Sequence, residues 1–308
     1  MSDFTSNFWS VYVTIITIVG IVGCGLLLWL TSRKKVEATA DNTTGHVWDE
    51  DLTEMNNPMP RWWMWLFVIT LLFGAGYLIA YPGLGTFKGQ LGWTQVGEYQ
   101  REMDKAAEQL QPLYARFDGM SAEQLAQDPA AMAIGDRLFM NNCAQCHGSD
   151  ARGSKGFPNL SDGDWLYGGD PEQIRQTIHD GRIGVMPPMA EAVGSGEDVR
   201  NVAQYVLSLS GSPHDSVRAA LGKPLFASCA ACHGADGKGN QALGAPNLTD
   251  DVWLHGWGEA AIVAMINNGK TNQMPAQAIA EGGKLTDAQI NVLTAYVWGL
   301  SHQGASGQ

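Results

Sequence analysis

The sequence is poor in positive charge and in cysteine. Its 308 residues include 19 Lys and Arg against 31 Asp and Glu, so the formal net charge is −12, and only 16% of the residues are charged. Nucleic-acid binding needs clusters of Lys and Arg, so this balance argues against a nucleic-acid partner and is compatible with a basic protein partner. Four of the five cysteines lie in two short motifs. A disulfide framework would spread its cysteines along the chain, so none is predicted.

Charge is absent altogether from two long apolar runs. They extend from Phe8 to Leu30 and from Trp62 to Gly85. Each run can cross a hydrocarbon core of about 30 Å as a helix. A buried helix of that length with no polar side would be unusual in a soluble protein. The sequence therefore predicts two transmembrane helices in a lipid bilayer.

The distribution of basic residues predicts the orientation of these helices. The segment "SRKK", Ser32 to Lys35, directly follows the first run, Arg61 precedes the second, and no Lys or Arg precedes Phe8. The positive-inside rule then puts the loop between the runs in the cytoplasm and both chain ends outside. A cleaved signal peptide has its positive charges before the apolar stretch, so the first run is interpreted as an uncleaved anchor.

From about residue 130 the sequence repeats itself once. Four blocks recur in the same order: "GDRLFMNNCAQCHG" with "GKPLFASCAACHG", "FPNLSDGDWLYGG" with "APNLTDDVWLHGW", "IRQTIHDGRIGVMPPM" with "IVAMINNGKTNQMPA", and "VAQYVLSLS" with "LTAYVWGLS". The outer blocks have helical spacing, whereas the middle is rich in Gly, Pro, Asn and Asp and shows no convincing strand pattern. We expect an all-α duplicated domain behind a membrane anchor. The predicted organisation is a first transmembrane helix (1–31), a cytoplasmic loop (32–61), a second transmembrane helix (62–85), a periplasmic linker helix (86–130), and two domains (131–212 and 213–308).

Both copies contain the pattern C-x-x-C-H, which is the attachment signature of c-type haem. The two thiols form thioethers with the two vinyl groups of one haem, and the adjacent histidine ligates the iron. The sequence thus predicts two covalently bound haem c groups, which also supply the large apolar core that such small, loop-rich domains lack. The attachment residues are Cys143, Cys146, Cys229 and Cys232, and the proximal iron ligands are His147 and His233.

Two other uses of such cysteine pairs fit the sequence less well. A structural zinc site would need two further Cys or His ligands at suitable spacing, and neither copy supplies them. A thioredoxin-like redox pair would need a βαβ context, and none is visible. The predicted topology also places both motifs outside the cytoplasm, where haem is attached to c-type cytochromes.

Methionine commonly fills the sixth iron position in cytochromes c and raises the haem potential. Met186 in "GVMPP" and Met274 in "NQMPA" occupy corresponding positions in the two copies, and each is followed by proline. Met189 competes with Met186 but has no counterpart in the second copy. The copies could exchange segments, so which methionine serves which haem stays open. With both iron positions filled by protein, the haems carry electrons, and no catalytic residue is predicted.

One irregularity separates the two copies. Three residues stand between Phe139 and Cys143, but only two between Phe226 and Cys229. Deleting one residue from a helix rotates what precedes it by about 100°. We expect a distorted first helix in the second copy, which puts the packing of Gly222 and Phe226 in doubt.

These motifs carry a family resemblance. Each copy resembles a class I cytochrome c domain, and nearly the whole chain resembles the dihaem subunit III (CcoP) of cbb3-type cytochrome c oxidase. The more specific stretch is "HVWDEDLTEMNNPMPRWW", from His46 to Trp63, which is similar to that family's loop and the start of its membrane helix.

The resemblance implies a role in bacterial respiration. A chain of this family sits in the inner membrane with its haem domains in the periplasm. It passes electrons from a donor cytochrome c to a monohaem cytochrome subunit and on to the haem-copper subunit of a proton-pumping oxidase. It has no catalytic centre of its own. The alternatives are a dihaem subunit of a membrane dehydrogenase that serves quinone, and a sensor with an open haem site.

Overall fold

The computed structural model describes residues 6–33 and 40–302, so Lys34 and Lys35 of the predicted basic segment lie outside the described residues. The chain forms two compact units, one up to Gln109 and one from Leu110 onward. The described parts of both units are mostly helical, which confirms the predicted fold class.

The two apolar runs form two long helices. They are α1 (Asn7–Ser32) and α2 (Arg61–Ala80), and both are long and apolar enough to cross a membrane. Their large apolar side chains, such as Val22 and Phe73, are exposed. An apolar surface of this extent is unfavourable in water, so the two helices suggest a membrane anchor.

The beginning of α1 and the segment after α2 lie together. The Ser10 hydroxyl accepts a hydrogen bond from the backbone N–H of Thr86 at 2.9 Å. Gly85 has a φ of +55°, and a Cβ there would lie 2.5 Å from the Ser10 carbonyl oxygen. Only glycine fits this contact without strain. The two helices therefore form a hairpin whose open ends share one side, as the predicted topology requires.

The loop between these helices contains a β-hairpin that the sequence analysis did not predict. Its strands are β1 (Thr43–Trp48) and β2 (Leu52–Met55), and the Trp48 indole N–H donates to a Glu54 carboxylate oxygen at 2.9 Å. The turn uses Asp49 and Glu50 at φ values of 46° and 73°. Hairpin turns with positive φ usually carry Gly or Asn, so the sequence held no turn signal.

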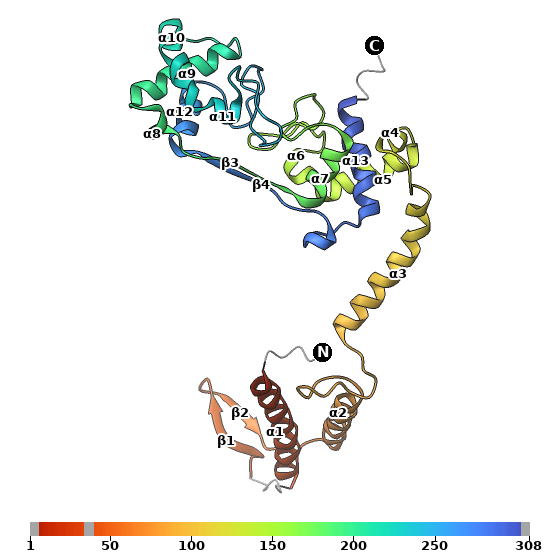
Figure 1. The fold of residues 1–308 in the computed structure, drawn as a ribbon. Helices are drawn as coiled ribbons and strands as arrows, with labels where there is room; N and C mark the ends of the chain where they lie inside the picture. The colour runs from red at the N-terminus through yellow and green to blue at the C-terminus, as the bar shows by residue number, and fades with distance from the viewer. Residues whose placement is uncertain (1–5, 34–39, 303–308) are drawn as a thin grey trace. The chain divides into compact units, whose positions relative to one another are not determined.

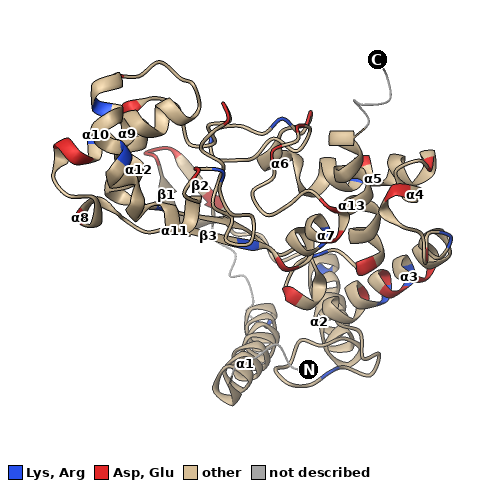
Figure 2. Cartoon of the chain, turned by 45° about the horizontal axis from the view of Figure 1, so that its top comes forward, with Lys and Arg blue, Asp and Glu red and all other residues tan. Residues whose placement is uncertain are grey.

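A charged helix and a short capped helix precede the first repeat. Figure 2 shows acidic and basic residues interspersed along α3 (Gln95–Ala115). The Ser121 hydroxyl caps α4 (Ala122–Leu125) by accepting the Gln124 backbone N–H. Leu125 is buried with Phe117 in a small cluster that also contains Val292 of the second repeat. Both ends of the duplicated region therefore meet in one lobe.

The duplicated region folds into two lobes, and each lobe combines helices from both repeats. The first lobe packs α5 (Pro129–Asn142), α6 (Ala144–His147) and α7 (Pro171–Asp180) with α13 (Asp287–His302). The second packs α10 (Ser216–Leu225), α11 (Ala230–His233) and α12 (Glu259–Asn268) with α8 (Ala190–Val193) and α9 (Gly196–Leu209). The closing helix of each repeat thus completes the core of the other.

Two antiparallel strands carry the chain between the lobes. β3 (Arg182–Met186) pairs with β4 (Lys270–Met274) from end to end, with Arg182 opposite Met274. Figure 1 shows the two strands side by side, running from the lobe that holds α12 to the lobe that holds α7. The sequence does not predict these strands, because each is five residues long and β4, "KTNQM", has no apolar alternation.

Small residues and aromatic rings build both helix crossings. The rings of Phe139 and Tyr296 lie 5.6 Å apart in the first lobe, and those of Phe226 and Tyr205 lie 5.3 Å apart in the second. A Cβ on Gly222 would lie 2.0 Å from the backbone oxygen of Asn201, so α9 and α10 approach as closely as their backbones allow. The packing of Gly222 and Phe226 is therefore sound in the second copy.

The one-residue deletion is absorbed at the end of the helix. In the first lobe α5 continues as an α-helix up to Asn142, next to Cys143. In the second, α10 contains Pro224 and is followed by the 3₁₀ turn η1 (Phe226–Ser228). A 3₁₀ turn advances further per residue than an α-helix, so it places Cys229 correctly with one residue fewer.

The Gly222 crossing gives a test of the fold. Alanine is a better helix former than glycine, but at this position it forces α9 and α10 apart. We expect Gly222→Ala to destabilise the chain by about 1–3 kcal/mol, as overpacking does. Gly196→Ala is the control, because a Cβ there meets nothing within 4 Å. Thermal unfolding of the detergent-purified chain, followed by circular dichroism, checks this. Equal midpoints for both variants would contradict the close crossing.

Candidate haem sites

The histidines of both C-x-x-C-H motifs are buried and held in the same way. The Nδ1 atom of His147 lies 3.0 Å from the carbonyl oxygen of Pro158, and Nδ1 of His233 lies 3.1 Å from that of Pro246. A carbonyl oxygen can only accept, so each Nδ1 carries the proton and each Nε2 keeps a free lone pair. This arrangement prepares a histidine to ligate a metal through Nε2.

Burial also keeps the second histidine neutral. It lowers the pKa of His233, while the hydrogen bond to Pro246 acts in the opposite direction. A neutral imidazole is the form that binds a metal ion. The electrostatics of the second lobe therefore agree with its hydrogen-bond geometry.

A single helical turn positions the cysteines of each motif. In the first copy the N–H groups of Cys146 and His147 both donate to the carbonyl oxygen of Cys143, at 3.1 and 3.0 Å. Gly148 then ends the turn at a φ of +79°, a conformation that favours glycine. The second copy repeats this geometry, with Gly234 at +78°. One turn thus brings both thiols and the histidine to one site.

The thiols do not resemble those of a redox-active pair. Burial, with a smaller contribution from Cys146, raises the pKa of Cys143 to about 11, and burial also raises the pKa of Cys229. Catalytic and redox C-x-x-C pairs have lowered pKa values. The structure therefore disfavours the thioredoxin-like interpretation.

The zinc interpretation also lacks support. Within the described ranges, no group of three or more His, Cys, Asp and Glu side chains is placed to hold a metal ion. A structural zinc site needs four such ligands. What the two motifs offer instead is one histidine and two thiols each, which is the donor set that haem c requires.

The predicted methionines lie in the lobes opposite to their own repeats. Met274 of the second repeat packs against the cluster that includes Cys143. Met186 lies at the far end of β3. Its carbonyl oxygen is so close to Gly269, at the end of α12, that a Cβ added there would lie 2.5 Å away. Met189 packs against the second-lobe cluster that includes Cys229. Each lobe thus receives its methionine from the other repeat.

The residues present fit a haem in each lobe. Cys146 and Cys232 are exposed while Cys143 and Cys229 are half-buried, so each pair lies at the border between core and surface. This suits a flat apolar group that is buried on one side and attached at its edge. The aromatic, aliphatic and methionine side chains of each cluster supply the apolar surroundings.

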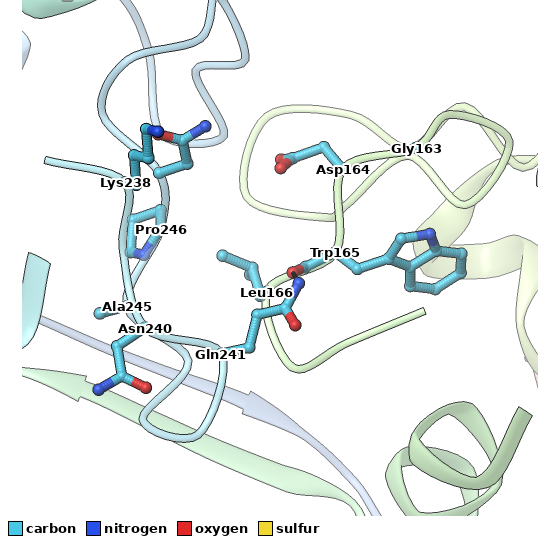
Figure 3. Close-up of a pocket in the computed structure, with 10 residues that line it drawn as sticks. Gly163, Asp164, Trp165, Leu166, Lys238, Asn240, Gln241, Ala245 and Pro246 are labelled. Carbon is cyan, nitrogen blue, oxygen red and sulfur yellow. Dashed lines mark hydrogen bonds between the residues drawn. The ribbon is translucent and has the colours of Figure 1, made fainter. Parts of the chain in front are cut away.

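The two lobes meet through the loops that follow the motifs. The side-chain amide of Gln241 donates to the carbonyl oxygen of Trp165 at 3.1 Å. A cavity of about 150 Å³ lies between these loops, and Figure 3 shows the segment with Asp164 and Trp165 facing the segment with Lys238 and Gln241. Burial, with smaller contributions from Asp250 and Asp162, raises the pKa of Asp164. Nothing in the sequence distinguishes this carboxylate, because only the fold brings it near Asp250.

The fold and the two sites fit the class of c-type cytochromes with two haem sites, here carried on a pair of apolar helices. Three family models match the chain. They are the N-terminal domain of cytochrome oxidase-cbb3, FixP, over residues 40–88, cytochrome c oxidase, cbb3-type, subunit III, over residues 130–206, and cytochrome c over residues 219–301.

Curated relatives match over nearly the whole chain. The cbb3-type cytochrome c oxidase subunit CcoP of Rubrivivax gelatinosus is 62% identical over 98% of this chain and 97% of its own length. The subunit FixPc of Rhizobium leguminosarum bv. viciae is 40% identical over 86% of this chain and 96% of its own length. The subunit CcoP of Cereibacter sphaeroides is 38% identical over 84% and 94%. The chain belongs to the CcoP/FixP family of cbb3-type cytochrome c oxidase subunits, which confirms the predicted resemblance.

The inter-lobe carboxylate gives a prediction about pH. A carboxyl whose pKa is raised by folding destabilises the fold once it is ionised, and this cost disappears below the unfolded pKa of about 3.9. Asp164→Asn should therefore raise the thermal midpoint at pH 7 by about 1–2 °C. The gain should shrink as the pH falls through the raised pKa and be absent below about pH 3.9.

Asp251→Asn is the matched control, because Asp251 is an exposed carboxylate in the neighbouring loop of the second repeat. It should leave the midpoint nearly unchanged at both pH values. A stabilisation by Asp164→Asn that is equal at pH 7 and below pH 3.9 would contradict the assigned cause.

Proposed function

We propose that this chain is the membrane-anchored, dihaem electron-transfer subunit of a cbb3-type oxidase. The observation that carries the proposal is the pair of equivalent sites in one chain. In each site a buried histidine donates a hydrogen bond from Nδ1 to a proline carbonyl oxygen, and its Nε2 is free. The full-length match to cbb3 oxidase subunits supports the same role.

In this proposal haem c is attached covalently in both lobes. Cys143 and Cys146 hold the first haem and Cys229 and Cys232 the second, and each pair forms thioethers with the two vinyl groups. When bound, haem c supplies reversible one-electron chemistry. The chain's own residues fix its position and exclude water, and they perform no bond-making step on a substrate.

The proximal iron ligands are His147 and His233. The carbonyl oxygens of Pro158 and Pro246 fix the tautomer and the orientation of each imidazole. Such outer hydrogen bonds also raise the basicity of the ligating nitrogen. The segments that begin at Pro158 and Pro246 therefore position the ligating histidines in both sites.

The distal ligands cross between the repeats. Met274 serves the first haem, because it packs in the first lobe with Cys143. Met186 serves the second haem, because the register of β3 and β4 makes it the counterpart of Met274: Arg182 pairs with Met274, and Met186 pairs with Lys270. We therefore propose the crossed pairing, which is one of the two that the sequence left open.

The backbone also separates Met186 from its competitor Met189. The N–H of Met189 donates to the carbonyl oxygen of Ile266 at 2.8 Å, and the N–H of Gln277 donates to that of Ile178 at 3.0 Å. Met189 is therefore the counterpart of Gln277, which cannot ligate haem iron as a thioether does. We assign Met189 to core packing, in agreement with its contacts around Val193.

The chain accepts electrons from a donor cytochrome c and delivers them to a monohaem cytochrome subunit and on to the haem-copper subunit. The α1–α2 hairpin anchors it in the inner membrane, with the loop between them in the cytoplasm and both haem lobes in the periplasm. The contact between Ser10 and Thr86 supports the placement of both ends of the hairpin on one side of the membrane. The basic residues between the helices favour the cytoplasm for the loop. The net charge of −12 suits a basic donor, whose encounter with the chain should weaken as salt screens the attraction.

The crossed ligation predicts which haem responds to which methionine. In a chain that keeps only the second haem, made by Cys143→Ser with Cys146→Ser, Met186→Leu should abolish the weak absorption band of Met–iron coordination near the red end of the oxidised spectrum. Met274→Leu should leave the band intact. Axial ligands set haem potentials over roughly 0.8 V, so Met186→Leu should also lower the remaining potential by on the order of 0.1 V.

The reciprocal background, Cys229→Ser with Cys232→Ser, should reverse the two results. Met189→Leu is the control in both and should preserve the band. If Met274→Leu removed the band of the second haem, the crossed assignment would be wrong, whereas the covalent attachment would stand.

The proposed role is tested by the composition of the complex. Detergent extraction of the native membrane, with an affinity tag on this chain, should recover a haem-copper subunit and a monohaem cytochrome together with oxygen consumption driven by reduced cytochrome c. The rate should fall as salt is raised. Recovery of a flavin or quinoprotein subunit instead would assign the chain to a dehydrogenase, and vacant sixth positions on both haems would indicate a sensor.

A further inference from the structure

A second cavity, of about 490 Å³, lies against the face of α12 that points away from the lobe core. Ile262 and Ile266 are buried in the core, whereas the opposite face of α12 forms the cavity wall. Two lysines and a histidine also line it. The lining residues that matter here are Ala261, Ala264 and Met265 on the apolar wall and Lys155, His255 and Lys270 as the polar groups.

In the first repeat a tyrosine ring covers the corresponding place. Tyr167 occupies the sequence position that His255 has in the second repeat. Its ring packs on Gly244, where a Cβ would lie 2.2 Å from the ring's Cζ. Arg182, the counterpart of Lys270, covers the ring with its Cζ 4.9 Å from the ring centroid. Substitution of histidine for tyrosine therefore distinguishes the open cavity from the closed one.

The cationic groups of the open cavity lack anionic partners. Arg182 in the first repeat donates to Thr177 and Gln176, at 3.0 and 2.9 Å. Those partners are neutral side chains. Lys155 and Lys270 are exposed, and no salt bridge involving either of them occurs within residues 6–33 and 40–302. In a chain with a net charge of −12, two unpaired lysines that line one cavity are a local reversal of charge.

The histidine adds a third donor. The side-chain amide of Asn272 donates to Nε2 of His255 at 2.9 Å, so the ring proton is on Nδ1. The pKa of His255 is lowered by burial first and then by Lys270 and Lys155. Both lysines are thus close enough to act on the ring. An anion bound beside the ring would be attracted by both lysine charges.

We propose that this cavity binds an organic anion, with its carboxylate or phosphate group held by Lys155 and Lys270 and its apolar body against Ala261, Ala264 and Met265. The lysines supply charge-assisted hydrogen bonds, and the α12 face supplies apolar contact. The anionic group can belong to a free small molecule or to an acidic side chain of a neighbouring subunit. The cavity adjoins the strand pair at Met186, which is opposite Lys270, but none of the proposed haem ligands lines it. Its proposal does not depend on the proposed electron-transfer role.

Calorimetric titration of the haem-loaded, full-length chain in detergent tests the site, with benzoate as the probe and benzamide as its neutral analogue. Benzoate should bind saturably and benzamide should not. Lys155→Gln and Lys270→Gln should each weaken benzoate binding by about tenfold or more, because each removes one charge-assisted contact. Lys284→Gln, which changes an exposed lysine outside the cavity, should have no effect.

His255→Tyr is the decisive variant, since it restores the residue of the closed repeat, and Gly156 stands where Gly244 accommodates the ring. It should abolish benzoate binding while the haem spectrum and thermal midpoint stay those of the parent chain. Equal binding by this variant and the parent, or no saturable binding by the parent, would overturn the proposal.

The intact complex separates the two sources of the anion. Benzoate binding that persists in the complex assigns the cavity to a free small molecule. Binding by the isolated chain that is lost in the complex assigns it to an acidic side chain of a neighbouring subunit. Both outcomes support an anion site, and the absence of binding in both preparations contradicts it.

Discussion

The structure depends on one feature: neither repeat closes its own hydrophobic core. The first helix of each repeat packs against the last helix of the other, through the Phe139–Tyr296 and Phe226–Tyr205 ring pairs. Burial of apolar area is the main favourable term in folding, so each lobe gains stability only when both repeats are present. The pairing of β3 with β4 is the geometric consequence, because the two segments that cross between the lobes run past each other in opposite directions.

The same feature organises the proposed haem sites. Each lobe takes its cysteines and histidine from one repeat and its methionine from the other, so a complete ligand set exists only in the paired structure. Within each lobe, the proline carbonyl that holds the proximal histidine is local to the repeat. The proximal side is therefore built by short-range structure and the distal side by the exchange. The two proposed haem sites therefore belong to one folding unit. The same unit holds the loops of Trp165 and Gln241 together between them.

Much of this could be predicted from the sequence, and the reasons are specific. The C-x-x-C-H motifs, the two uncharged runs and the repeated Gly-x₃-Phe spacing before Cys143 carry local signals, because haem attachment, membrane crossing and close helix packing each demand particular residues. The exchange could not be predicted, because two equivalent repeats present the same surfaces to each other as to themselves. The β1–β2 hairpin escaped because Asp49 and Glu50 replace the usual glycine. The cavity beside His255 could not be predicted, because its lining combines Lys155 of the first repeat with Lys270 of the second.

The exchange is tested most directly by cutting the chain between its repeats. A protease site inserted at Gly211, an exposed residue with a φ of +68°, allows cleavage of the folded, haem-loaded protein in its membrane. If each lobe is built from both repeats, the C-terminal fragment cannot leave without unfolding, so it should stay with the membrane fragment through washes with high salt. Release of that fragment as a folded, soluble cytochrome with Met–iron coordination would contradict the account.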